Sequence, residues 1–205
     1  MAVEQFRKAL ASQPSYLFAI DSIAEIGLHT NNPEMLEEAL QFGVDTALPE
    51  TLLAWRIAAA TFRMNQTEAF QLLDELTLIE SDAPYWLDLS CRCLRRAGWN
   101  DDLTRNIRRR TTDFEYRNIA PSFAFCVIAA EHLARQPYYS DAAALIKKGL
   151  QRKQDDPTPW QWLALWSDRI FELGDYLQAA MKAAELTPDD ADAIARKIKK
   201  AKTDA

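Results

Sequence analysis

The 205-residue sequence contains little of what a β-sheet protein requires. Valine occurs three times and glycine five times, whereas alanine occurs 32 times and leucine 24 times. Strands are enriched in β-branched residues and tight hairpin turns in glycine, so this composition excludes an all-β fold. Hydrophobic residues make up 48% of the chain and charged residues of both signs 26%, which excludes the disordered class. The composition therefore predicts an all-α protein.

Long hydrophobic runs are absent, and cysteine and histidine are scarce. No apolar stretch approaches the ~20 residues that cross a bilayer, and the first residues lack the apolar core of a signal peptide. The three cysteines and two histidines have no metal-ligand spacing. The formal net charge of −6 argues against nucleic acid as the main partner. We therefore expect a cytoplasmic protein with no cofactor, no metal, no membrane segment and no catalytic residues.

Prolines recur at a nearly constant interval. Successive members of one series are 35, 35, 37, 36 and 31 residues apart: Pro14, Pro49, Pro84, Pro121, Pro157 and Pro188. Because proline cannot continue a helix and disfavours helix in the residue before it, each of these prolines marks a corner between helices. An interval this regular predicts a repeat of about 35 residues.

Each interval splits into two helices around a polar or glycine-containing break. The expected pairs are 17–29 with a helix ending near 45, 50–64 with 68–79, 84–97 with 101–109, 122–135 with 140–151, and 160–173 with 176–185. This pattern predicts a right-handed α-solenoid of about five helix-turn-helix repeats, with a capping helix at 191–200, in a single domain over 1–205. Residues 3–11 would be the second helix of a hairpin whose first helix is missing. That uncovered end predicts either a longer parent protein or a homo-oligomer joined there.

The residues of these repeats resemble the tetratricopeptide repeat (TPR) family. The segment 174–190, GDYLQAAMKAAELTPDD, is similar to the second helix and exit of such a repeat. First helices of the family begin with an aromatic residue followed by a large-small pair, and Trp55 with Ala58 and Ala59 fits this pattern. Trp166, where a small residue belongs, marks a divergent member. The resemblance covers nearly the whole chain and implies a non-catalytic scaffold or adaptor that binds another protein.

The resemblance also implies which residues line the concave groove that receives the partner. Carried over by the aromatic start of each first helix, they are Arg56, Ala60, Arg63, Asp88, Arg95, Phe125, Ile128 and Glu131. The lysines and asparagines of the family's carboxylate clamp are absent, so a peptide or amphipathic helix suits this groove better than an acidic tail. The alternative is an RNA-binding repeat, because the pentatricopeptide family shares the period. A pI near 5.0 counts against that alternative.

Eight arginines fall within residues 92–117 of this acidic protein. In the helix expected at 101–109, Leu103 and Ile107 lie one turn apart and face inward, which turns Arg105 and Arg109 toward solvent. One interpretation is a solvated face balanced by nearby aspartates. The other is a docking patch for an acidic surface of the partner, since the planar guanidinium pairs well with carboxylates.

Several aromatic and apolar residues complete the expectations. The segment 111–120 is expected to be a loop that either exposes Phe114 and Tyr116 or folds them under as a lid. Trp55, Trp86 and Leu165 are expected to be buried between hairpins.

Overall fold

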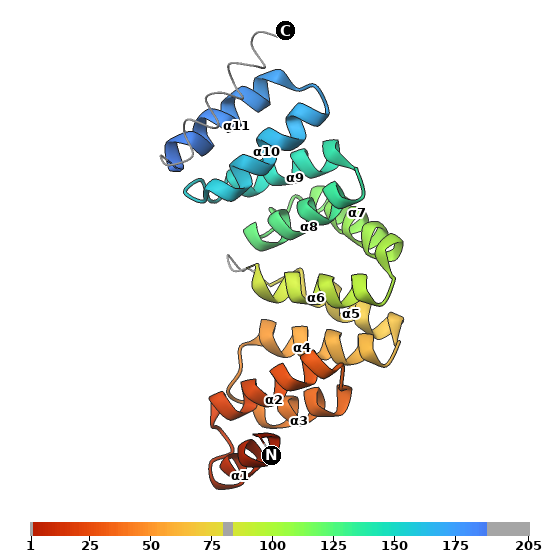
Figure 1. The fold of residues 1–205 in the computed structure, drawn as a ribbon. Coiled ribbons are helices and arrows are strands. Elements are labelled where there is room, and N and C mark those ends of the chain that lie inside the picture. Colours follow the sequence, from red (N-terminus) through yellow and green to blue (C-terminus); the bar gives the residue numbers. More distant parts are fainter. Residues whose placement is uncertain (1, 80–83, 188–205) are drawn as a thin grey trace. The chain divides into compact units, whose positions relative to one another are not determined.

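The structure, a computed structural model, describes residues 2–79 and 84–187. These residues form eleven α-helices and no strand, which confirms the all-α expectation (Figure 1). The helices are α1 (Ala2–Ser12), α2 (Leu17–Thr30), α3 (Pro33–Gly43), α4 (Pro49–Phe62), α5 (Gln66–Leu76), α6 (Tyr85–Arg96), α7 (Asn100–Tyr116), α8 (Phe123–Arg135), α9 (Tyr139–Leu150), α10 (Pro157–Arg169) and α11 (Leu173–Leu186). The capping helix expected at 191–200 lies outside the described residues. No described helix combines the length and apolar character that crossing a membrane requires.

The helices follow one another as five hairpins, α2–α3, α4–α5, α6–α7, α8–α9 and α10–α11, as the proline interval predicts. They fall into two compact units, which divide between Asp113 and Phe114, near the end of α7. Each unit is a stack of hairpins, the arrangement from which α-solenoids are built. The single domain expected from the sequence stays a prediction.

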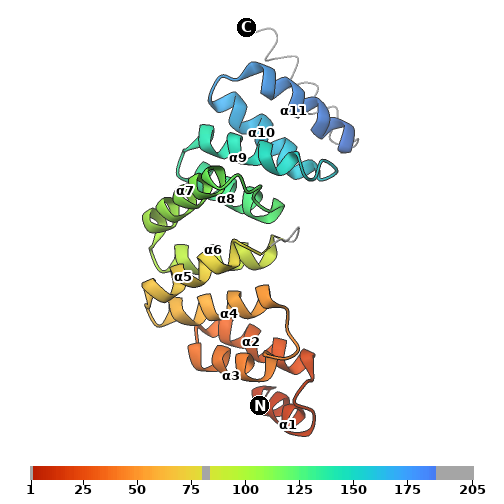
Figure 2. The ribbon, with the colours of Figure 1, turned by 180° about the vertical axis from the view of Figure 1, so that it is seen from behind.

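In the first unit, α2 packs on α3, α4 on α5, α3 on α4, and α4 on α6, so that successive hairpins share a core (Figures 1 and 2). Buried residues from three of these helices, Ile20, Leu36 and Trp55, belong to that core, and α1 adds Leu10. The guanidinium of Arg7 on α1 donates two 2.7 Å hydrogen bonds to the carboxylate of Glu38 on α3. The buried Leu10 and this ion pair therefore attach α1 to the first hairpin.

In the second unit, α8 packs on α9, α9 on α10, and α10 on α11. The α8–α9 contact requires a glycine, because a Cβ at Gly149 would lie 2.9 Å from the Cβ of Cys126. The ring of Phe125 on α8 meets the edge of Phe114 at a centroid distance of 5.2 Å. Close helix packing in this unit thus depends on a glycine at position 149 and on an edge-to-face aromatic pair.

The first helix of every hairpin ends with the same backbone hydrogen bond, from an N–H to the carbonyl five residues earlier. The pairs are Asn32 to Gly27, Asn65 to Ala60, Trp99 to Leu94, Tyr138 to Leu133, and Glu172 to Ser167, at 2.9–3.1 Å. This bond defines a Schellman motif, which places a left-handed residue just before the donor. Four of the five turns have one at that position, namely Asn31, Met64, Gly98 and Phe171, with φ between 52° and 83°.

Side-chain caps begin the next helices. Asn32 and Asn65 accept hydrogen bonds from the backbone N–H of Met35 and Glu68 at the starts of α3 and α5. Ser122 caps α8 in the same way. The asparagines directly follow the left-handed residue, so one short polar sequence both ends a helix and begins the next. Ser140, by contrast, lies inside α9, because that helix begins one residue earlier at Tyr139.

The helix α7 extends seven residues beyond the end that the sequence predicts at Arg109, and the expected loop at 111–120 is wrong over its first half. Nothing between Arg109 and Tyr116 breaks a helix, and the threonine hydroxyls at 111 and 112 return hydrogen bonds to carbonyls one turn back. Phe114 is buried, whereas Tyr116 is 90% exposed. The two aromatic residues therefore lie on opposite faces of one helix.

The last hairpin also differs from expectation. The helix α10 ends at Arg169, and Gly174, expected to end it, lies inside α11. The turn is made by Phe171, which has a left-handed backbone conformation. Because the sequence has no glycine at that position, it does not predict the turn there. Leu165 is 52% exposed, so its predicted burial is wrong: Leu163 and Trp166 occupy the inner face of α10 instead.

Trp86 is half-buried and packs against the core of the first unit. Its ring meets that of Trp55 edge-on at 6.4 Å between centroids. The expectation of a buried tryptophan between hairpins is thus met fully by Trp55 and partly by Trp86.

Replacing Phe171 by glycine should stabilise the protein. A side chain costs roughly 1–2 kcal/mol in the left-handed region, and Phe171 is 94% exposed, so little packing is lost in return. We expect Phe171→Gly to raise the free energy of unfolding by about 1 kcal/mol in urea titrations. Arg169→Gly, two residues earlier at helical φ, should lower it by about 0.5–1 kcal/mol. Equal destabilisation by both substitutions would contradict this account of the turn.

Candidate functional site

A groove of about 360 Å³ lies between α3 and α4 in the first unit. Its apolar lining comes from Leu40 on α3, Leu52 and Ala60 on α4, and Val44 just after α3. Val44 is 63% exposed, which makes it an apolar lip at the mouth of the groove. The charged residues of the lining are Glu37, Arg56, Arg63 and Glu68. The groove therefore offers an apolar floor with charged flanks.

Small residues on the facing helices create this space. α4 contributes Ala59 and Ala60 where a larger side chain would fill the groove. The end of α3 lies close to α4, since a Cβ at Gly43 would lie in van der Waals contact with the indole of Trp55, at 3.4 Å. The helices thus approach closely at one end of their contact, and alanine leaves the remaining volume empty. The groove is a direct consequence of the alanine-rich composition.

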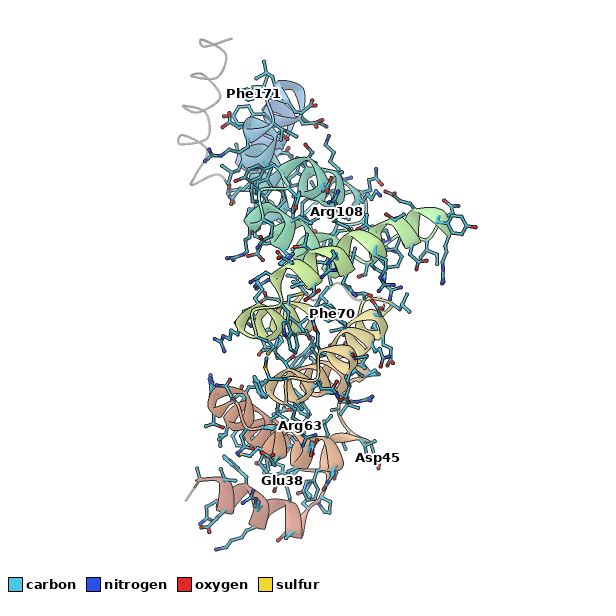
Figure 3. The ribbon with its side chains drawn as sticks, turned by 90° about the vertical axis from the view of Figure 1, so that its right-hand side faces the viewer. Glu38, Asp45, Arg63, Phe70, Arg108 and Phe171 are labelled. Atoms are coloured by element: carbon cyan, nitrogen blue, oxygen red, sulfur yellow. The ribbon has the colours of Figure 1, made fainter. Side chains whose placement is uncertain are left out.

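Two of the four charged groups in the groove are paired with each other. Arg63 forms an ion pair with Glu37 across the α3–α4 contact. The hydrogen bond with Glu37 raises the pKa of Arg63 above its ordinary value. Figure 3 shows Arg63 in the lower stack of helices.

The other two charged groups differ in their surroundings. The carboxylate of Glu68 accepts a 2.8 Å hydrogen bond from the side-chain amide of Asn65, the residue that caps α5. Arg56 is exposed and has no carboxylate partner among the residues that the structure describes. Arg56 is therefore the one charged group of the groove whose charge the described residues leave uncompensated.

Three residues that the family resemblance assigns to a groove, Arg56, Ala60 and Arg63, converge on this one. The two assigned residues of α6 lie apart from it and pair with charged neighbours on their own helix. Asp88 contacts Arg95 at 3.6 Å and also forms a 3.0 Å ion pair with Arg92.

The three assigned residues of α8 lie in the second unit. Phe125 is 1% exposed and Ile128 is 5% exposed, so their side chains serve packing in this structure. Glu131 pairs with Arg135 one turn later on α8, at 2.6 Å. None of the three presents an uncompensated charge or an open apolar surface to a partner.

Arg105 and Arg109, the arginines of the expected docking patch, line a second groove, of about 430 Å³, between α5 and α7. Arg105 forms an ion pair with Asp102 on its own helix. Arg109 donates to both carboxylate oxygens of Asp74 on α5, at 2.8 and 2.6 Å. Phe70, labelled in Figure 3, contributes a ring to this groove. The charges here are mutually balanced, as the solvated-face interpretation of the arginines expects.

Arg110 has a structural role that the sequence analysis missed. Its side chain is 7% exposed and donates a 2.8 Å hydrogen bond to the carbonyl of Asp74, near the C-terminal end of α5. Its guanidinium also lies 3.2 Å from the carboxylates of Asp74 and Asp113. The sequence does contain a signal for this role. Leu103, Ile107 and Arg110 follow one another at spacings of four and three residues, which places Arg110 on the inward face of α7. The arginine-rich segment therefore holds α7 to α5 as well as facing solvent.

The cysteines show no sign of activated thiol chemistry. Burial raises the pKa of the Cys93 thiol to about 11 and that of the Cys126 thiol to about 12. Among the residues that the structure describes, no three His, Cys, Asp or Glu side chains come together as metal ligands would.

Comparisons with known proteins find a distant structural likeness and no family for this chain. No protein-family model and no curated protein matches the sequence. One similar solved structure is that of YrrB, described as a TPR protein with an unusual peptide-binding site. The match covers 97% of this chain and 99% of that one, with 13% sequence identity and a TM-score of 0.46. A likeness this distant does not indicate what the present chain binds.

Asp74 should be a stability determinant of the first unit, because it also accepts a 3.0 Å hydrogen bond from the buried side chain of Asn106. Asp74→Asn removes the negative charge from three donors, so we expect a loss of about 1.5–3 kcal/mol in the free energy of unfolding. Asp45→Asn, on an exposed residue of the loop after α3, should change it by less than about 0.5 kcal/mol. Urea titrations of both variants measure the difference, and equal stabilities would contradict the proposed α5–α7 contact.

Cys93 and Cys126 should resist alkylation in the folded protein. Their raised pKa values keep both thiols protonated at pH 8, and burial excludes the reagent. Mass spectrometry of peptides after a short iodoacetamide pulse should find both unmodified in buffer and both modified in 8 M urea. Rapid labelling of either residue in buffer would show an open or activated thiol.

Proposed function

We propose that the chain is a non-catalytic protein-interaction scaffold of the TPR-like class, and that the α3–α4 groove receives a short peptide or one face of an amphipathic helix from its partner. The observation that carries the proposal is the groove itself, with its apolar floor, exposed Val44 and charged flanks. Protein surfaces that bind helices or peptides combine apolar pockets with a polar rim in this way.

The dimensions suit a small segment. Ligand pockets span roughly 300–1,000 Å³, and this groove lies at the lower end of that range. It would take a few side chains rather than a whole helix. The rest of the partner would lie across the exposed surface of α3 and α4.

A reducing compartment such as the cytoplasm agrees with this proposal. The three cysteines are buried, and structural disulfides are characteristic of oxidising compartments. RNA binding has less support, because arginines that could contact phosphates, such as Arg105 and Arg109, already pair with carboxylates of their own unit.

Val44→Asn tests the groove without changing the net charge. A displayed library of random 12-residue peptides is selected on the purified chain, and the affinities of enriched peptides are measured by fluorescence anisotropy. Val44→Asn removes apolar surface from the lip, and we expect about tenfold weaker binding. Leu165→Asn, on a comparably exposed aliphatic residue of the second unit, is the matched control and should bind as the unaltered chain does.

Urea titrations of both variants establish that each remains folded. Failure to enrich any peptide would contradict the proposed function. So would enriched peptides whose affinities Val44→Asn and Leu165→Asn change equally.

A further inference from the structure

The charges around the α3–α4 groove specify its partner more closely. Resting on the proposed function, we infer that the bound segment carries a carboxylate that pairs with Arg56, beside an apolar side chain that occupies the space between Leu40 and Leu52. The partner class is therefore an acidic, amphipathic peptide segment. A basic or uncharged segment is the alternative that the experiment below separates from it.

The first step of the argument is the state of the four charged groups. Glu37 is held by Arg63, and the carboxylate of Glu68 by the side chain of Asn65. A basic side chain entering the groove would have to compete with these existing interactions. Arg56 has no described carboxylate to give up, so an incoming carboxylate gains a charge-assisted hydrogen bond without breaking another.

The second step is the position of Arg56 on α4. Leu52, Arg56, Ala59 and Arg63 follow one another at spacings of four, three and four residues, which places them along one face of the helix. The side chain of Arg56 therefore leaves α4 one helical turn after Leu52, which belongs to the apolar floor. A ligand that fills the floor brings its neighbouring residues within reach of Arg56. Arginine suits this role because its planar fork can bind both oxygens of a carboxylate.

The third step is a comparison with three other exposed arginines of the first unit, Arg92, Arg105 and Arg109. Arg105 and Arg109, which line the second groove, each have an aspartate partner, and Arg92 pairs with Asp88. Their charges are compensated inside the protein. Arg56 combines an uncompensated charge with an adjoining apolar groove, which is the combination that an acidic amphipathic segment complements.

The probe for the test is the most enriched peptide of the random 12-residue library, together with versions in which each Asp or Glu is replaced by its amide or by lysine. These are titrated against the unaltered chain, Arg56→Gln and Arg56→Glu. Arg169→Glu, a reversal on an exposed arginine at the end of α10, is the matched control for the change in net charge.

We expect the enriched peptides to contain more acidic than basic residues. Loss of one exposed ion pair should weaken binding about two- to fivefold in Arg56→Gln, and replacing the critical carboxylate by its amide should weaken it by the same factor. The two changes together should weaken it no further than either alone. Arg56→Glu should prefer the lysine version, and Arg169→Glu should behave as the unaltered chain does. The effect should shrink between 50 and 500 mM NaCl.

Three outcomes would overturn parts of the account separately. Enriched peptides without an acidic residue, or equal responses of Arg56→Glu and Arg169→Glu, would overturn the pairing with Arg56. If Val44→Asn still weakened those peptides, the groove would remain their site. Peptides that neither Val44→Asn nor Arg56→Glu affects would overturn the proposed function itself.

Discussion

Each hairpin of this protein depends on the backbone hydrogen bond that closes the end of its first helix. The bond leaves the last carbonyls of that helix satisfied and reverses the chain within a few residues. Because the reversal is the same in all five hairpins, successive hairpins within each unit can bury their apolar faces against one another. Met64 and Phe171 make the turn with large side chains in the left-handed region, so the geometry is kept even where the residue is poorly suited to it.

The α3–α4 groove follows from how this stack is filled. Alanine on the facing side of α4 favours the helix but is too small to fill the contact. The two helices lie close together at Gly43, and the Arg63–Glu37 ion pair joins them as well. The volume of the groove, its apolar lip at Val44 and the uncompensated charge of Arg56 thus come from neighbouring positions on, or just after, α3 and α4. In the α5–α7 contact, by contrast, the charges of Asp74 and of its arginine partners compensate one another.

The sequence predicts the hairpins well because proline and polar breaks act locally. Its errors concern features that the proline and polar breaks do not mark. Phe171 makes a turn without glycine, whereas the sequence pattern predicts that α10 continues to Gly174. Arg110 is buried because Asp74, 36 residues away, supplies its acceptors. The residues that the family resemblance assigns to a groove differ in the same way. Those of α4 line one groove, whereas Phe125 of α8 is buried by neighbouring helices, which the sequence of α8 alone does not predict.

Hydrogen–deuterium exchange with and without a selected peptide tests the central claim most directly. If the groove between α3 and α4 is the binding site, the peptide should slow exchange in the segments 37–48 and 52–63, and leave exchange in α8–α11 unchanged. Ligand contact and reduced local opening both lower the exchange rate of a bound segment. Protection confined to α8–α11, or to the second groove between α5 and α7, would contradict the account.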